Sequence, residues 1–121
     1  MPITRCNSAG FQILLGLALF TATIAMLAPG SGSPPPFAHA DKLVHAAGFL
    51  LLAFFADAGW PHLGFVRAKY LPLLAYGIFI ECLQHYIPGR SFELLDILAD
   101  AGGLLLYAKL FLPALRRLQI R

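Results

Sequence analysis

Carboxylate and imidazole side chains recur at a spacing of four residues in separate parts of the chain. The pairs are Asp41 and His45, Glu81 and His85, and the two carboxylates Asp96 and Asp100. Side chains four residues apart on an α-helix point within about 40° of each other, so each pair shares a helix face. Such groups could transfer a proton or bind a cation if their helices brought them together.

Two basic residues are suited to compensate these acids. Lys42 lies beside the first pair, and Arg90 follows the turn-forming residues Pro88 and Gly89. A guanidinium can hold a carboxylate or a phosphate through two parallel hydrogen bonds. We therefore expect Lys42 and Arg90 to be the counter-charges of the cluster, with Gln84 flanking it.

The composition of the chain is that of a membrane protein. Of its 121 residues, 59% are hydrophobic and only 12% are charged, and the mean hydropathy is +0.73. An ionisable group buried in a bilayer costs about 2.5 to 3.5 kcal/mol on insertion scales, so several at one depth must satisfy one another. We expect the polar residues to converge rather than to face lipid.

Four apolar stretches have the length that crosses a bilayer, roughly 18 to 20 residues. Their ranges are about 11–28, 42–60, 70–87 and 94–112. Pro72 falls in the first turn of the third stretch, and Pro113 is expected to close the fourth. The predicted fold is an all-α, integral membrane four-helix bundle that forms a single domain over residues 1–121.

Residues 29–40 are rich in proline, glycine and serine and predict an extended connector. A cleaved signal peptide ending near residue 40 is the alternative for the first stretch. Its apolar core is long for that purpose, so we favour a retained span.

The distribution of basic residues predicts the orientation. Threading four spans places most of the nine Lys and Arg residues on one side, leaving Lys42 and Arg90 on the other. Those on the first side are Arg5, Arg67, Lys69, Lys109, Arg116, Arg117 and Arg121. Both termini are then expected in the cytoplasm. All acids except Asp57 fall toward the outer side.

The order of these polar residues resembles the VanZ-like family of small bacterial membrane proteins. The resemblance covers residues 41–105 and rests on four motifs. They are Asp41-Lys42-x-x-His45, Glu81-x-x-Gln84, Pro88-x-Arg90 and Asp96-x-x-x-Asp100-x-x-Gly103. One difference is Asp100, where the family's motif carries asparagine. The resemblance implies a multi-pass protein of the bacterial cytoplasmic (inner) membrane and a link to low-level teicoplanin resistance, but no settled biochemical activity.

The expected function is an outer-leaflet polar site for an amphiphile, such as a lipid-linked wall precursor or a lipoglycopeptide. Polar side chains would meet its head and the helices its tail. The expected ligand-binding residues are Asp41, Lys42, His45, Glu81, Gln84, Arg90, Asp96, Asp100 and Gly103.

Several other functions stay open at this stage. The first is an enzyme acting on a phosphorylated lipid, with Glu81, Asp100 and His45 as acid or base candidates. Ser91 is the only serine near them and has no base partner, so the sequence does not decide whether the chain is an enzyme. The others are proton movement, for which Asp57 is the only ionisable group on the inner half, and a structural bundle with polar contacts between helices.

The expected partners are membrane lipids, and a homo-oligomer stays open. The basic residues form no stripe with aromatic neighbours, so nucleic acid is not expected. Cys6 and Cys82 show no metal-ligand spacing. A divalent cation among the acids and His45 is considered as a variant of the enzyme hypothesis, but the spacing is not diagnostic, so no metal or cofactor is assigned.

Overall fold

The computed structural model describes residues 7–29 and 39–120, and over these ranges the chain contains helices and no strands. The elements in chain order are α2 (Ser8–Leu27), α3 (Ala40–Gly59), the π-helical turn η1 (Val66–Tyr70), α4 (Leu71–Gln84), α5 (Leu94–Leu106), the π-helical turn η2 (Tyr107–Phe111) and α6 (Leu112–Arg117). The backbone stays helical from η1 into α4 and from α5 through η2 into α6.

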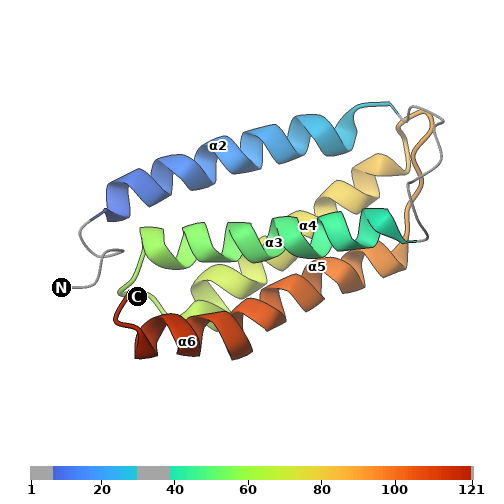
Figure 1. Cartoon of the computed structure of the whole chain (residues 1–121). Coiled ribbons are helices and arrows are strands. Elements are labelled where there is room, and N and C mark those ends of the chain that lie inside the picture. The colour runs from blue at the N-terminus through green and yellow to red at the C-terminus, as the bar shows by residue number, and fades with distance from the viewer. Residues whose placement is uncertain (1–6, 30–38, 121) are drawn as a thin grey trace.

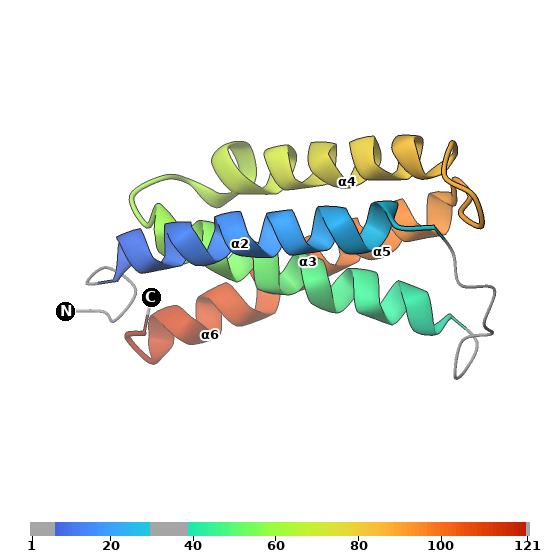
Figure 2. The same cartoon turned by 90° about the horizontal axis from the view of Figure 1, so that it is seen from above.

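The elements make four antiparallel helical rods that run up and down (Figure 1). The start of α2 and the end of α6 lie at one end of the bundle, while the start of α3, the end of α4 and the start of α5 lie at the other (Figures 1 and 2). The prediction of an all-α four-helix protein is confirmed, and the rods overlap the four predicted ranges. Most of the connector, residues 30–38, lies outside the described residues, as do Arg5, Cys6 and Arg121.

Each π-helical turn ends just before a proline. η1 ends at Tyr70, two residues before Pro72, and η2 ends at Phe111, two residues before Pro113. A proline inside an α-helix lacks the N–H donor and crowds the preceding turn, and a wider π turn accommodates both effects. The expectation that Pro113 closes the last helix is therefore wrong, because the helix continues to Arg117.

Close packing of α3 against α5 depends on a glycine. A Cβ atom at Gly103 would overlap the backbone carbonyl of Ala46, whereas the neighbouring Gly102 has open space in that direction. Phe49, Leu52 and Leu104 are almost fully buried at this interface and form the centre of the core. The two helices thus approach closely at the level just below the polar residues.

Within residues 7–29 and 39–120, two helices, α2 and α3, are long and apolar enough to cross a membrane, as judged by length and composition. The other two rods are interrupted by their π turns, so neither is one α-helix of that length. α2 has no buried residue, and large apolar side chains such as Ile13, Leu17 and Phe20 are exposed on it.

Candidate functional site

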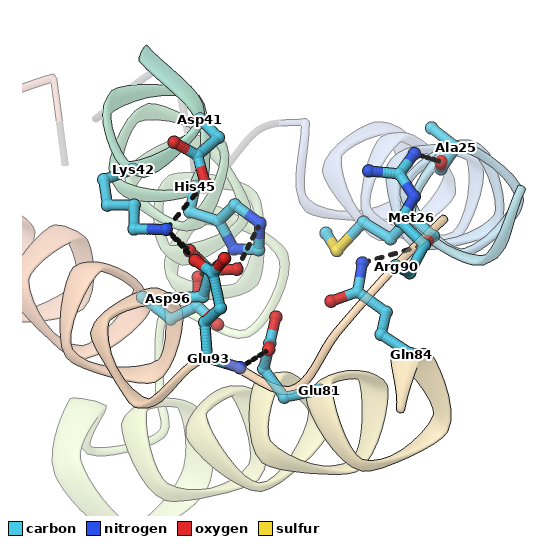
Figure 3. A network of polar contacts seen from close by, with 11 residues as sticks. Ala25, Met26, Asp41, Lys42, His45, Glu81, Gln84, Arg90, Glu93 and Asp96 are labelled. Atoms are coloured by element: carbon cyan, nitrogen blue, oxygen red, sulfur yellow. Dashed lines mark hydrogen bonds and ion pairs between the residues drawn. The ribbon is translucent and has the colours of Figure 1, made fainter. Parts of the chain in front are cut away.

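Lys42 is the centre of an ionic network at the end of the bundle where α3 begins. Its ammonium lies 2.7 Å from Asp41 Oδ2 and 2.8 Å from Asp96 Oδ1, and it also pairs with the Glu93 carboxylate. Figure 3 shows these side chains converging from α3, from α5 and from the turn that precedes α5. Lys42 therefore is a counter-charge, as the sequence predicts.

His45 lies one turn deeper on α3 and contacts both acids of α5. Its Nδ1 atom lies 2.8 Å from Asp100 Oδ1, and its Nε2 atom lies 3.8 Å from Asp96 Oδ2. Asp100 is 1% exposed, so this contact is enclosed by protein. A carboxylate only accepts hydrogen bonds, so Nδ1 is the donor toward Asp100.

Glu81 joins the network from α4 and is fully buried. Its Oε2 atom accepts a hydrogen bond of 2.9 Å from the backbone N–H of Glu93. Its other oxygen, Oε1, is buried and has no hydrogen-bond partner. One ligand atom each of His45, Glu81 and Asp96 lies within 4.8 Å of the other two, so three acceptor-rich groups meet at one point.

We call this set the polar cluster. It consists of Asp41, Lys42, His45, Glu81, Glu93, Asp96 and Asp100. Five carboxyl groups face one lysine and one histidine, so the cluster has an excess of negative charge. An additional cation or a proton would be favourable there, and a phosphate would not.

Gln84 and Arg90 are not part of the polar cluster, although the sequence places them beside it. Arg90 donates from Nε to the carbonyl of Ala28 at 3.0 Å and from Nη2 to that of Ala25 at 3.3 Å. Gln84 Nε2 donates to the carbonyl of Met26 at 2.8 Å. These three carbonyls are at the C-terminal end of α2, where unpaired acceptors and the helix dipole attract donors and positive charge.

The direction of Arg90 follows from the turn that precedes it. The N–H of Arg90 donates to the carbonyl of Ile87 at 3.0 Å, and Gly89 has a φ of 75°. Proline followed by a glycine of positive φ is the signature of a type II turn. This turn places Arg90 against α2 (Figure 3), so the expectation that it neutralises the carboxylates is wrong.

The remaining sequence candidates divide in a similar way. Gly103 packs against the backbone of Ala46. The three atoms nearest to a Cβ placed at Gly103 all belong to Ala46, and none belongs to a cluster residue. His85 is exposed beside Tyr86 because α4 ends at Gln84, so it does not share a buried face with Glu81. Glu93 was not among the sequence candidates, yet its carboxylate binds Lys42 and its backbone N–H holds Glu81.

A groove of about 490 Å³ runs between α2 and α3 and reaches the cluster at His45. Its walls are apolar, with Leu14, Met26 and Phe55 among the lining residues, and Gly48 lies in its floor. A Cβ atom at Gly48 would meet nothing within 4 Å. The apolar groove therefore borders the polar cluster at His45.

No known family, curated protein or solved structure matches the chain.

A second ionic site at the other end of the bundle was missed in the sequence. Asp57 Oδ1 lies 2.6 Å from Lys69 Nζ, and Asp57 Oδ2 accepts a hydrogen bond of 2.7 Å from the Tyr107 hydroxyl. All three side chains are buried to 2% exposure or less. Lys69 lies in η1 and Tyr107 in η2. The sequence places Lys69 on the cytoplasmic side and assigns no role to Tyr107, because nothing in their spacing from Asp57 links them.

Proposed function

We propose that the chain is an integral membrane protein with four spans, although only α2 and α3 meet the length and composition of a span as single α-helices. The exposed apolar side chains on all four rods support this proposal. They include Leu17 and Phe20 on α2, Leu43 and Leu51 on α3, Phe79 on α4, and Leu98 and Leu105 on α5. Such a surface is compatible with lipid and unfavourable in water. The described lysines and arginines other than Lys42 and Arg90 lie in η1, η2 and α6, toward the end where α2 begins and α6 ends. This distribution supports a cytoplasmic location for that end.

We propose that its function is to bind an amphiphile at the junction of the α2–α3 groove and the polar cluster. The observation that carries this proposal is that His45 belongs to both, because it lines the groove and contacts Asp100. An apolar tail would lie between α2 and α3, and a polar head would meet His45 and the acids. Ligand sites commonly combine apolar walls with a few oriented polar groups.

The charge of the polar cluster favours one kind of head group. Amine or hydroxyl donors would find unfilled acceptors there, whereas an anionic phosphate would be repelled, and Arg90 is engaged by α2. Amine-bearing lipidated compounds fit this description better than a phosphorylated wall precursor. The ordered motifs from Asp41 to Gly103 support membership of the VanZ-like family, and we propose an effect on sensitivity to teicoplanin-type lipoglycopeptides.

Filling the groove tests this function. Gly48→Leu places a side chain in the groove without a backbone clash, and Gly102→Leu makes the same change at another open glycine outside it. Binding of a fluorescent amine-headed, single-chain amphiphile to the full chain in detergent should weaken at least about tenfold, or 1.4 kcal/mol, in Gly48→Leu only. Equal binding by both variants would exclude the groove as the binding site of the amphiphile.

A second function, acid–base catalysis on a membrane-embedded substrate, is favoured by the His45–Asp100 contact. A carboxylate that holds one imidazole nitrogen leaves the other free to take up a proton, which is the arrangement of many general bases. Ser91 is exposed and takes part in none of the cluster's hydrogen bonds or ion pairs. The substrate or a water molecule would therefore supply the nucleophile. Chemical conversion of a bound amphiphile that falls in His45→Gln by a larger factor than its binding affinity does would distinguish catalysis from binding alone.

A further inference from the structure

Three acceptor groups from three helices meet in the polar cluster without a donor between them. They are His45 on α3, Glu81 on α4 and Asp96 on α5, and one ligand atom of each lies within 4.8 Å of the others. Lys42 is the nearest cation, but its contacts are with Asp41, Glu93 and the Oδ1 atom of Asp96. It makes no contact with Glu81.

Glu81 has a buried carboxylate oxygen that is available to bind a ligand. It is fully buried, its Oε2 atom is held by the Glu93 N–H, and one of its carboxylate oxygens lies within 4.8 Å of ligand atoms of His45 and Asp96. Oε1 has no hydrogen-bond partner. A buried carboxylate oxygen without a partner is costly, because it has lost the water that would solvate it. A positive charge beside Oε1 would remove that cost.

His45 is oriented as a metal ligand would be. Its Nδ1 atom is held by the buried Asp100 carboxylate at 2.8 Å. In a neutral imidazole whose Nδ1 is the donor, Nε2 carries the lone pair, and this atom faces Asp96 Oδ2 at 3.8 Å. A carboxylate that holds the far nitrogen of a ligating histidine is a common outer-sphere arrangement in zinc sites.

We propose that His45, Glu81 and Asp96 bind one divalent transition-metal ion, with Asp100 as the positioning residue of His45. One imidazole and two carboxylates are the ligand types that Zn²⁺ accepts, and three protein ligands leave a coordination position open. Magnesium and calcium prefer oxygen ligands alone. Because His45 also lines the α2–α3 groove, the ion lies where a ligand entering the groove would reach it. The inference does not depend on the amphiphile, since it rests on the three ligands alone.

The test is a Zn²⁺ titration of the purified full chain in detergent, after removal of metal, in competition with a chromophoric zinc chelator and with excess Mg²⁺. We expect one Zn²⁺ per chain. Glu81→Gln and His45→Gln should each weaken binding more than about 100-fold, which exceeds the usual effect of outer-sphere changes. Glu93→Gln and Asp41→Asn are matched controls, because both acids pair with Lys42 but are not proposed ligands. Each should weaken binding by less than about tenfold, at or below the lower end of outer-sphere effects.

Two outcomes would overturn the proposal. The first is no stoichiometric binding by the unchanged chain, which would mean that Glu81 and Asp96 share a proton instead. The second is a loss in Glu93→Gln or Asp41→Asn that exceeds the loss in Glu81→Gln, which would place the ion among Asp41, Glu93 and Asp96 instead. Visible absorption of Co²⁺ bound to the chain gives an independent readout of a nitrogen ligand, and it should change in His45→Gln. Gly48→Leu should keep Zn²⁺ binding even where it loses the amphiphile, so the two proposals can fail separately.

Discussion

His45 on α3 and Asp100 on α5 are joined by a contact of 2.8 Å between Nδ1 and Oδ1, across the interface that Gly103 keeps narrow. These two residues are 55 positions apart in the chain. Their contact fixes the ring of the histidine, so that its other nitrogen lies 3.8 Å from Asp96 Oδ2, in the group that also holds Glu81. Asp100 therefore sets the orientation of His45 although it is not itself one of the proposed metal ligands.

Asp100→Asn should retain the hydrogen bond to His45 but remove its negative charge. The amide oxygen can still accept from Nδ1, while the imidazole becomes a weaker ligand. We expect Zn²⁺ affinity to fall about tenfold, at the lower end of outer-sphere effects. Chelator competition measures this change. Asp100→Leu, which abolishes the acceptor, should weaken binding further, and an equal effect of both variants would contradict the positioning role.

Gly103→Ala should destabilise the bundle, because its new methyl group would overlap the Ala46 carbonyl. Overpacking of this kind costs about 1 to 3 kcal/mol. Gly102→Ala is the matched control, since it has open space and a helical glycine loses up to about 1 kcal/mol relative to alanine. Thermal unfolding in detergent should therefore shift in opposite directions for the two neighbours. A neutral Gly103→Ala would mean that α3 and α5 are farther apart than described.

Lys69→Met should destabilise the other end of the bundle strongly. It leaves the Asp57 carboxylate buried without its ammonium partner, and breaking a buried pair in this way costs about 3 to 5 kcal/mol. The double variant Asp57→Asn with Lys69→Met should recover much of the loss, because no uncompensated charge remains. Unfolding midpoints of the single and double variants give the coupling, and additive losses would argue against a direct pair.

Arg90→Ala should loosen the end of α2 without changing the polar cluster. It removes two hydrogen bonds to α2 carbonyls, each worth about 1 to 2 kcal/mol at most in a partly solvated position. Hydrogen exchange should accelerate in the last turn of α2, and Zn²⁺ affinity should stay unchanged. Arg90→Lys should restore part of the protection. A loss of Zn²⁺ binding in Arg90→Ala would place this arginine at the site after all.

The elements and the polar convergence of this chain could be predicted because both follow from local rules. Apolar stretches of bilayer length gave the four rods, and the spacing of four residues placed Asp41 with His45 and Asp96 with Asp100. The direction in which a side chain leaves a loop does not follow from such spacing. Arg90 could only be placed by the type II turn and the free carbonyls of α2, which are three-dimensional features.

The second ionic site shows the same limit. The buried Lys69 lies in the π turn η1, and the only sequence sign of this turn is Pro72, two residues after its end at Tyr70. The buried Tyr107 lies in η2, and the only sequence sign of that turn is Pro113. By local rules, a proline after an apolar run predicts the end of a helix. Here each helix continues through a wider π turn, and each π turn contributes a side chain that contacts the buried Asp57.

The two charged sites lie at opposite ends of the same helices, with mostly apolar side chains and glycines between them. Sliding of α3 along α5 would have to separate Lys42 from Asp96 at one rim and Asp57 from Tyr107 at the other in a single step. The two sites therefore hold the rods of α3, α4 and α5 together at both ends. α2 is joined to them by apolar packing, such as Phe11 against Phe54, and by hydrogen bonds of Gln12, Thr23 and its last carbonyls. A guest that entered the groove from the side would have to part these contacts alone.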